Sequence, residues 1–483
     1  MTFPLDTIVA WAKRRWFVYP GSDIYGGLAN AWDYGPYGSV LKKNIADARW
    51  KFFVQQRDDM VGMDSQILMH PRVWEASGHV GNFNDPMIDD KKTGERFRAD
   101  KLIEDKIQQI RDKVGEQGTT DAVVKVYGVP NLIPESWTFD QMKAFITAEI
   151  PNNPNSKKHD KADWTDVRKF NMMFSTHQGV IENDESKVWL RPETAQGIFV
   201  NFRNVTDTTR MRVPFGIAQI GKAFRNEITP GQFLYRTREF EQMEIEYFVE
   251  NDHDKAMERF EDWKSASQEF WKDIVWLKAE NLKFREHEKD ELAHYSAGTF
   301  DVEYQFPWGR WELQGLAYRT DFDLKQHMEF SGKDMQYTDP YSGKRYVPHV
   351  IEPSFGLSRT VLVTMLDAYD EEKYTNGKWE EETRTVARFH KTIAPIKFCV
   401  IPLLKKDPKM VGMAEDIYRK LSKDYMCEFD DSGNIGKCYR RQDEIGTPYC
   451  ITVDHQSLED NTVTIRDRDT MAQERISISD IKL

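Results

Sequence analysis

Residues 237–249, TREFEQMEIEYFV, decide the fold because apolar and polar side chains alternate along them. Successive side chains of a β-strand point to opposite faces, so an alternation with a period of two predicts a strand. The face predicted to meet the core carries Met243, Ile245, Tyr247 and Val249. The opposite face carries Phe240, Gln242, Glu244 and Glu246. Because an antiparallel sheet can leave one face uncovered, we expect the acidic face to be open to solvent or a ligand.

The segment before it, residues 215–227, predicts an antiparallel partner strand. The small residues Gly221 and Ala223 leave room above the sheet, and Arg225 and Glu227 are expected to continue the same face to the end of the strand. The connection between the two strands contains a Pro-Gly pair and predicts a hairpin with a long loop. An ordinary hairpin with a polar outer face would show the same pattern, so these strands alone do not specify a site.

Residues 346–369 predict a further strand followed by a helix. The residues expected to share one face of the strand are Val350, Glu352 and Ser354, and those expected to end it are Pro353 and Gly356. Apolar residues then recur at helical spacing at Leu357, Val361, Met365 and Ala368, which predicts a buried helix.

Arg359 falls in the first turn of that helix. The N-terminus of a helix attracts anions, so an arginine there suits a polyphosphate, although a surface arginine is the simpler interpretation of this residue alone. In residues 310–320, Glu312 and Gln314 are expected to lie on one side of another strand. A carboxylate on a sheet that faces phosphates could hold Mg²⁺, which prefers oxygen ligands.

The composition is that of an ordinary globular protein of 483 residues, long enough for two or three domains. A net charge of -12 argues mildly against generic nucleic-acid binding, although short basic clusters such as Arg440-Arg441 could contact phosphates. The four cysteines form no C-x-x-C pair, and no apolar run is long enough for a membrane span. We therefore expect a cytoplasmic protein with no membrane partner.

Changes in the character of the sequence predict four regions. Residues 1–100 are rich in aromatic residues and glycine, residues 101–165 are polar and resemble an insertion, and residues 166–390 carry the best strands. Residues 371–390 at the end of this core are charged and interrupted by glycine, which predicts a linker. Residues 391–483 are expected to form a separate α/β domain.

Taken together, these segments resemble the signature motifs of class II aminoacyl-tRNA synthetases. The sequence FRNE at residues 224–227, followed by a loop and R-x-x-E-F at residues 236–240, resembles motif 2, and GLSR at residues 356–359 resembles motif 3. The expected helix at residues 37–56 stands where motif 1 would form a dimer interface. Longer stretches, including RPETAQG at residues 191–197, are similar to bacterial-type homodimeric glycyl-tRNA synthetases.

The resemblance implies an α+β fold, with an antiparallel sheet flanked by helices and a C-terminal α/β anticodon-binding domain. It also implies that the protein joins glycine to tRNA(Gly) by way of glycyl-adenylate, with release of pyrophosphate from ATP. We expect a homodimer that uses ATP with Mg²⁺. No zinc site is expected, because residues 85–98 lack the cysteines that many relatives carry there.

The same resemblance assigns roles to residues of the nucleotide site. Arg225 would hold the α-phosphate and Arg359 the γ-phosphate, as the two catalytic residues, while Glu227 would read the adenine amino group and Phe240 would stack on its ring. Glu312 falls at the Mg²⁺ position. The full expected ATP-binding set is Arg225, Asn226, Glu227, Tyr235, Arg236, Thr237, Arg238, Glu239, Phe240, Glu312, Leu313, Gly356, Leu357, Ser358 and Arg359.

For glycine, the resemblance assigns the ammonium group to Glu193, with Glu244, Glu352 and Ser354 completing an acidic pocket. The full expected glycine-binding set is Arg98, Glu193, Phe240, Glu241, Gln242, Met243, Glu244, Arg319, Glu352, Pro353, Ser354, Phe355 and Gly356.

Two other functions share parts of this pattern. A class II synthetase for proline, threonine or histidine would have the same motifs, but the RPETAQG stretch and the pocket carboxylates favour glycine. A non-catalytic RNA-binding relative would have lost the nucleotide residues, whereas Arg225, Glu227, Phe240 and Arg359 are all present.

Overall fold

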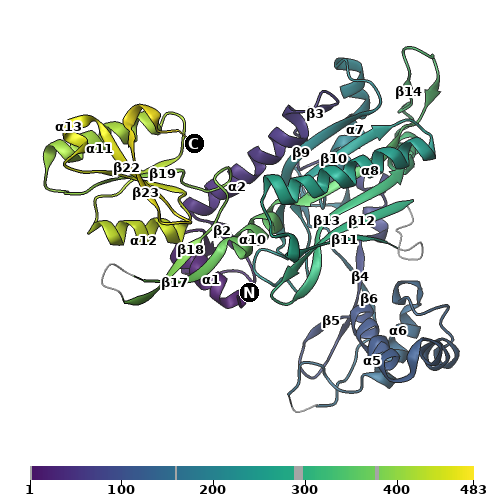
Figure 1. Ribbon diagram of the computed structural model, residues 1–483. Helices are drawn as coiled ribbons and strands as arrows, with labels where there is room; N and C mark the ends of the chain where they lie inside the picture. The colour runs from purple at the N-terminus through teal and green to yellow at the C-terminus, as the bar shows by residue number, and fades with distance from the viewer. Residues whose placement is uncertain (1–2, 158–159, 288–296, 376–379, 483) are drawn as a thin grey trace. The chain divides into compact units, whose positions relative to one another are not determined.

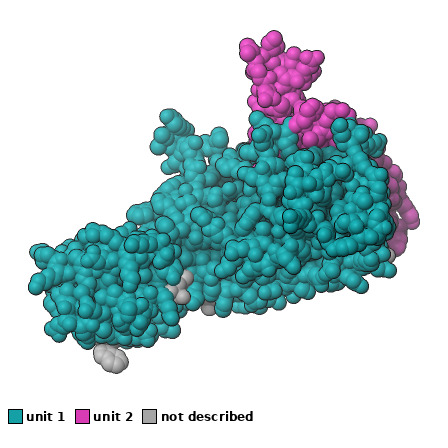
Figure 2. All heavy atoms as spheres, turned by 90° about the horizontal axis from the view of Figure 1, so that it is seen from above, with its two compact units in different colours: residues 1–69, 193–224, 230–483 teal, residues 70–192, 225–229 magenta. Residues whose placement is uncertain are grey.

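The computed structural model describes residues 3–157, 160–287, 297–375 and 380–482, and it divides into two compact units (Figures 1 and 2). Unit 1 comprises residues 1–69, 193–224 and 230–483. Unit 2 comprises residues 70–192 and 225–229.

Unit 1 is built on a seven-stranded sheet with the strand order β11-β12-β13-β16-β10-β9-β3. Its strands are β3 (Met60–Gly62), β9 (Phe215–Phe224), β10 (Glu239–Val249), β11 (Leu282–Glu286), β12 (Gly298–Phe306), β13 (Gly309–Thr320) and β16 (His349–Gly356). Neighbouring strands are antiparallel, except that β3 is parallel to β9. The hairpin predicted from the sequence is the β9–β10 pair, in which Phe240 lies opposite Ala223.

The prediction that Arg225 and Glu227 continue the face of β9 is wrong. The strand ends at Phe224, and the chain turns at once, because the backbone N–H of Glu227 donates to the carbonyl of Arg225 at 2.7 Å.

One face of the sheet is covered by α2 (Pro36–Trp50), α8 (His253–Glu269) and α10 (Leu357–Ala368) (Figure 1). The side chains of β10 predicted to meet the core lie here, in the largest apolar cluster of the protein, which confirms the prediction. The buried helix predicted after residue 356 is α10. The helix expected at residues 37–56 is α2, extended by a single π turn at Lys51–Gln55.

The other face of the sheet is also covered, so the prediction that the acidic face is open to solvent is wrong. α7 (Ala195–Thr208) packs on β9 and β10, and α9 (Phe322–Ser331) packs on α7. The apolar side chains of α7, including Phe199 and Phe202, form a second core with β9 and β10. Gln242 and Glu244 of β10 are therefore buried, and Glu246 is fully buried.

Pro353 lies inside β16 rather than at its end, contrary to the prediction, whereas Gly356 does end the strand. Proline lacks the N–H that a central strand needs. The ladder between β10 and β16 passes from the pair Glu244–Ser354 directly to the pair Tyr247–Ile351, so the missing donor falls at a break in the ladder.

Residues expected to form a linker form a β-hairpin instead. Its strands are β17 (Tyr369–Thr375) and β18 (Glu381–Ala387), and residues 376–379 lie outside the described part of the chain. The C-terminal sheet follows, in the order β20-β19-β21-β22-β23. Its elements are β19 (Phe398–Pro402), α11 (Pro408–Leu421), β20 (Cys427–Phe429), α12 (Ile435–Ile445), β21 (Tyr449–Val453), α13 (Ser457–Asp460), β22 (Thr462–Asp467) and β23 (Gln473–Ser477).

The remaining short elements of unit 1 are α1 (Leu5–Arg14), β1 (Val18–Pro20), β2 (Trp32–Tyr34), β14 (Tyr337–Thr338) and β15 (Arg345–Tyr346). Among the described residues, no helix has the length and apolar character that a membrane crossing requires.

Unit 2 has a small core of its own and extends beyond the predicted insertion on both sides. Its elements are α3 (Arg72–Ala76), α4 (His79–Asn82), β4 (Asn84–Asp89), β5 (Arg96–Arg98), α5 (Ala99–Thr120), α6 (Phe139–Glu149), β6 (Arg168–Asn171), β7 (Ser175–His177) and β8 (Lys187–Trp189). α6 begins with a capping box, in which Thr138 and Gln141 satisfy each other's backbone N–H groups. Ile103, Ile107 and Phe145 bury the apolar sides of α5 and α6 against each other.

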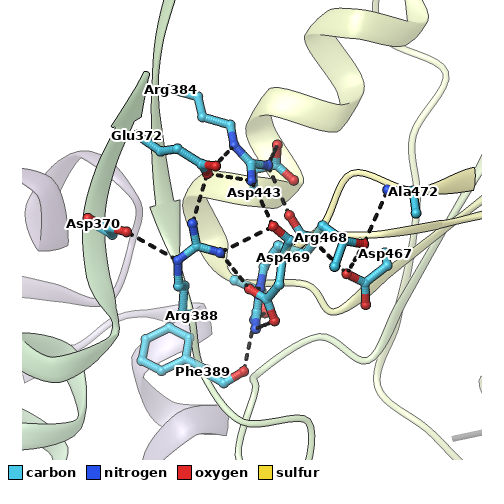
Figure 3. Close-up of polar contacts among 12 residues, drawn as sticks. Asp370, Glu372, Arg384, Arg388, Phe389, Asp443, Asp467, Arg468, Asp469 and Ala472 are labelled. Carbon is cyan, nitrogen blue, oxygen red and sulfur yellow. Dashed lines mark hydrogen bonds and ion pairs between the residues drawn. The ribbon is translucent and has the colours of Figure 1, made fainter. Parts of the chain in front are cut away.

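Buried ion pairs fasten the β17–β18 hairpin to the C-terminal sheet (Figure 3). Arg384 of β18 donates to Asp443 of α12 at 2.9 Å and to Glu372 of β17 at 2.7 Å. Arg466 of β22 donates to both oxygens of Asp443, at 2.7 and 3.0 Å. One buried carboxylate thus serves two buried guanidinium groups.

We predict that Asp443→Ala lowers the free energy of unfolding by about 3–5 kcal/mol, because it leaves two buried arginines without this partner. Urea denaturation would measure the change. As a control, Glu381→Ala breaks an ion pair with Lys373 in which both side chains are exposed, and should change stability by less than about 1 kcal/mol. Equal effects of the two substitutions would contradict the prediction.

Candidate active site

Glu244 lies at the centre of a buried group of acidic side chains on the α7 face of the sheet, which we call the acidic pocket. One carboxylate oxygen accepts hydrogen bonds from the backbone N–H of Thr194, at 3.0 Å, and from its hydroxyl. The other accepts from the amide of Gln242 at 2.9 Å and from the hydroxyl of Ser354 at 3.0 Å. Four donors from three segments therefore fix a carboxylate that is 2% exposed.

Arg319 of β13 is the cation of this pocket, and acidic residues hold it on two sides. Its Nε and Nη2 donate to Asp323 of α9 at 2.8 and 2.9 Å, and its Nη1 donates to Glu352 of β16 at 2.9 Å. The amide of Gln196 donates to Asp323 at 3.1 Å and to Glu193 at 3.0 Å. Glu193 is thereby oriented by the same network.

The acidic pocket holds more carboxyl groups than basic groups. The carboxyl groups are Glu193, Glu244, Glu246, Glu352 and Asp323, and Arg319 is the guanidinium among them. Burial, and next the charge of Glu352, raise the pKa of Glu246 well above its ordinary value. Burial also raises the pKa of Glu352, although Arg319 opposes the shift. Such an excess of buried carboxyl groups suits a small cationic ligand such as an ammonium group.

A second cluster in unit 1 forms where α10 begins. The guanidinium of Arg359 lies 4.3 Å from the centre of the Tyr235 ring and donates to the carboxylate of Glu312 at 3.1 Å. The hydroxyl of Tyr235 donates to the backbone carbonyl of Glu312 at 3.2 Å. Three residues predicted to bind ATP are thus in mutual contact beside the N-terminus of a helix, where anions are favoured.

Three protein-family models match parts of the chain. The anticodon binding domain model matches residues 397–482, the model of the tRNA synthetase class II core domain (G, H, P, S and T) matches residues 174–368, and that of glycyl-tRNA synthetase insertion domain 1 matches residues 85–128. The glycine–tRNA ligases of Staphylococcus aureus strains JH9 and Newman are each 50% identical to this chain over 482 residues, which cover 100% of it and 98% of each relative.

The chain belongs to the glycine–tRNA ligase family. Solved structures agree on the fold. The prolyl-tRNA synthetase of Cryptosporidium parvum complexed with L-proline and AMP aligns with a TM-score of 0.59 at 12% identity, covering 99% of this chain and 76% of that one. The same enzyme with halofuginone and AMPPNP gives a TM-score of 0.60 at 13% identity, with 98% and 73% covered. The predicted family, the α+β class II core and the anticodon-binding domain are confirmed.

The residues predicted from the family resemblance do not all face the two clusters. Met243, Phe355, Leu313 and Leu357 have their side chains in the apolar core on the α2 face of the sheet. Gln314, predicted to lie beside Glu312, is instead separated from it by a β-bulge at Leu313, because Val302 pairs with Gln314 and Glu303 with Glu312. Gln314 is buried, and it donates to Ser267 of α8 and accepts from Trp271 in the turn that follows α8.

The other predicted residues of unit 1 lie on or near β10 and its loop. Glu241 forms an ion pair with Lys42 at 2.5 Å, and Glu239 pairs with Lys222. The hydroxyl of Thr237 donates to the carbonyl of Glu239. Arg236 in the loop and Phe240 in β10 are half-buried. Pro353 and Gly356 lie in the neighbouring strand β16.

Four predicted residues belong to unit 2. Arg225 donates to the carbonyl of Pro192 at 3.1 Å and lies 5.4 Å from the ring centre of Phe83. The backbone N–H of Asn226 donates to Met172 at 2.7 Å, Glu227 follows in the same turn, and Arg98 forms an ion pair with Asp85 at 3.3 Å.

Several residues of the acidic pocket were not predicted from the sequence. Thr194 and Gln196 lie within the RPETAQG stretch. Asp323 had no sequence signal, because it belongs to α9 whereas its partner Arg319 belongs to β13. His327, which contacts Gln196 at 2.8 Å, had no sequence signal.

We predict that Glu246→Gln stabilises the protein more at higher pH. An exposed glutamic acid loses its proton above about pH 4.3, whereas Glu246 holds its proton to higher pH in the folded state because burial raises its pKa. Above about pH 4.3 the unfolded chain therefore binds fewer protons at this position than the folded protein does. The glutamate side chain thus makes the free energy of unfolding fall as pH rises above that value. Melting temperatures of the variant and parent, compared at about pH 5 and about pH 8, would measure the change.

Neither oxygen of Glu246 has a hydrogen-bond partner among the described residues, so the isosteric amide breaks no bond. Glu329→Gln, on the exposed side of α9, is the control and should show no such pH dependence. A difference in melting temperature between Glu246→Gln and the parent that does not vary with pH would show that Glu246 ionises normally.

Proposed function

We propose that this protein is an ATP-dependent glycine–tRNA ligase. It activates glycine to glycyl-adenylate, releases pyrophosphate and transfers glycine to the 3′ end of tRNA(Gly). The enclosed pocket around Glu244 carries the proposal, because it offers an excess of carboxyl groups to an ammonium group. The 50% identity to glycine–tRNA ligases along the whole chain supports it.

On the glycine side, Glu193, Glu244 and Glu352 receive the ammonium group. Ser354 orients Glu244, and Arg319 limits the repulsion between the acids. A pocket fitted to glycine rejects larger amino acids by overpacking, which costs about 1–3 kcal/mol or more. Because every competing amino acid is larger, no separate editing site is needed to exclude a smaller one.

On the nucleotide side, Arg225 binds the α-phosphate, Arg359 binds the γ-phosphate, Glu227 reads the adenine amino group and Phe240 stacks on the ring. The carboxylate of glycine attacks the α-phosphorus itself, so the reaction needs no protein nucleophile. Catalysis then depends on orientation and on charge stabilisation by the two arginines. The remaining ATP-binding and glycine-binding residues predicted from the sequence are proposed for the same two sites, except Met243, Phe355, Leu313 and Leu357, whose side chains lie in the apolar core.

Glu312 is the residue that would hold Mg²⁺ with ATP. Its carboxylate is half-exposed and supplies the oxygen ligand that Mg²⁺ prefers. No cluster of three metal-ligating side chains occurs within the described ranges, so phosphate oxygens would complete the coordination. When bound, Mg²⁺ would offset the charge of the triphosphate. Arg359 now pairs with Glu312, and ATP binding would release it toward the γ-phosphate.

To test the proposal, purified protein would be incubated with ATP, Mg²⁺, labelled glycine and tRNA, and acid-precipitable glycine would be counted. We expect glycine to be attached to tRNA only when the protein, ATP, Mg²⁺ and tRNA are all present. Glu244→Gln should lower kcat/KM for glycine by about 10–100-fold, the loss expected for a hydrogen bond to a charged group. Glu329→Gln, on the exposed side of α9, should not. Absence of charging by the parent protein would contradict the proposed function.

We further propose that the protein is a cytoplasmic homodimer. α2 stands where motif 1 forms the dimer interface in the family, and the loop before it exposes Ile24, Tyr25 and Leu28 at 75–88%. Exposed apolar side chains that lie close together are typical of a protein interface. Sedimentation equilibrium at micromolar concentration should give about twice the chain mass of 56.7 kDa. A mass close to that of one chain would contradict the dimer.

A further inference from the structure

Asn30, in the loop between β1 and β2, places its side-chain amide inside the long loop that joins β9 to β10. Its Nδ2 lies 3.1 Å from the carbonyl oxygen of Gly231 and 2.8 Å from those of Phe233 and Arg236. Its Oδ1 accepts the indole N–H of Trp32 at 2.8 Å. Because an indole can only donate, this bond fixes which end of the amide is the nitrogen. One amide group therefore serves three carbonyls of a single loop.

The loop that Asn30 holds has a strained backbone. Gln232 and Phe233 both have positive φ angles, 50° and 58°, in the left-handed region that residues with a side chain rarely adopt. A bridge between Gly231 and Arg236 closes the turn. The ring of Phe233 is 3% exposed and packs edge-on against Trp32 with their centres 4.8 Å apart. Strained backbone persists when its surroundings determine it, and here Asn30 and Trp32 supply that support.

The loop also sets the position of the nucleotide cluster. The backbone N–H of Tyr235 donates to the carbonyl of Gln232 at 3.0 Å, so the strained turn places Tyr235 directly. Arg359 lies over the Tyr235 ring and its Nε is 3.4 Å from the Tyr235 carbonyl. A continuous series of contacts thus leads from Asn30 through the loop to Arg359.

We propose that Asn30 is a positioning residue for the nucleotide side of the reaction, and that it acts by holding the β9–β10 loop in the conformation that presents Tyr235 and Arg359. The inference rests on the proposed function and extends it to a residue some 200 positions away in the sequence. This role also explains why residue 30 is an asparagine. The position requires an NH₂ group that donates to several carbonyls and an oxygen that accepts from Trp32.

The test is Asn30→Asp, which keeps the shape of the side chain but places an oxygen against three carbonyl oxygens. Aspartate, like asparagine, tolerates the positive φ of 49° at this position. Kinetics of glycine-dependent ATP–pyrophosphate exchange would give separate KM values for ATP and glycine. We expect KM for ATP to rise by about tenfold, in line with the loss of a hydrogen bond, and KM for glycine to change by less than about twofold.

Asn44→Asp is the matched control, because the Asn44 amide also donates to backbone carbonyls, those of Ile393 and Ala394 at 3.2 and 3.0 Å. It should leave both KM values unchanged. Asn30→Gly, which removes the amide without straining the backbone, should raise KM for ATP in the same way if the aspartate variant folds poorly. Unchanged KM for ATP in the folded Asn30 variants, or equal rises in both KM values, would overturn the inference. If the parent protein shows no glycine-dependent exchange, the proposed function fails instead.

Discussion

The burial of several carboxyl groups around one guanidinium group is the constraint on which the rest of the structure depends. Arg319 lies between Asp323 and Glu352 and is 6% exposed. A buried charge is tolerated only when it is paired and hydrogen-bonded, so each group here must find partners or remain neutral. Glu244 is satisfied by four donors, whereas Glu246 has none among the described residues, and burial raises its pKa well above the ordinary value. The same excess of carboxyl groups creates a place for an ammonium group.

β10 couples this pocket to the opposite face of the sheet. Arg49 of α2 is fully buried there and donates to the carbonyl of Met243, the residue next to Glu244, at 2.6 Å. Its guanidinium lies 5.4 Å from the ring centre of Phe53 and 4.6 Å from that of Phe355. Burial lowers the pKa of Arg49 to about 9, so the group remains a cation at neutral pH. The strand that carries Glu244 is therefore held from both faces.

Local sequence patterns predicted the features that depend on neighbouring residues. The alternation along β10, the hairpin with β9, and the helix that begins near Arg359 were all evident from spacing, and each is present. The predictions that were wrong concern features that depend on contacts between segments distant in the sequence. The cover of the acidic face by α7 and the buried role of Arg384 in the hairpin near residue 380 required tertiary contacts, which no local pattern contains. The bulge at Leu313 changed which side Gln314 faces by inserting one residue, and a period of two cannot anticipate such a shift.

For the site, the family resemblance named Glu193, Glu244 and Arg359. It did not name Thr194, Asp323 or Asn30, because their roles follow from contacts between distant parts of the fold.

The most direct test of the central claim, an acidic pocket that accepts an amino acid without a side chain, is ATP–pyrophosphate exchange measured separately with glycine, alanine, serine and proline. The structure and the family predict exchange with glycine and none above background with the other three. Exchange with alanine or serine at a rate comparable to that with glycine, or exchange with proline in place of glycine, would contradict it.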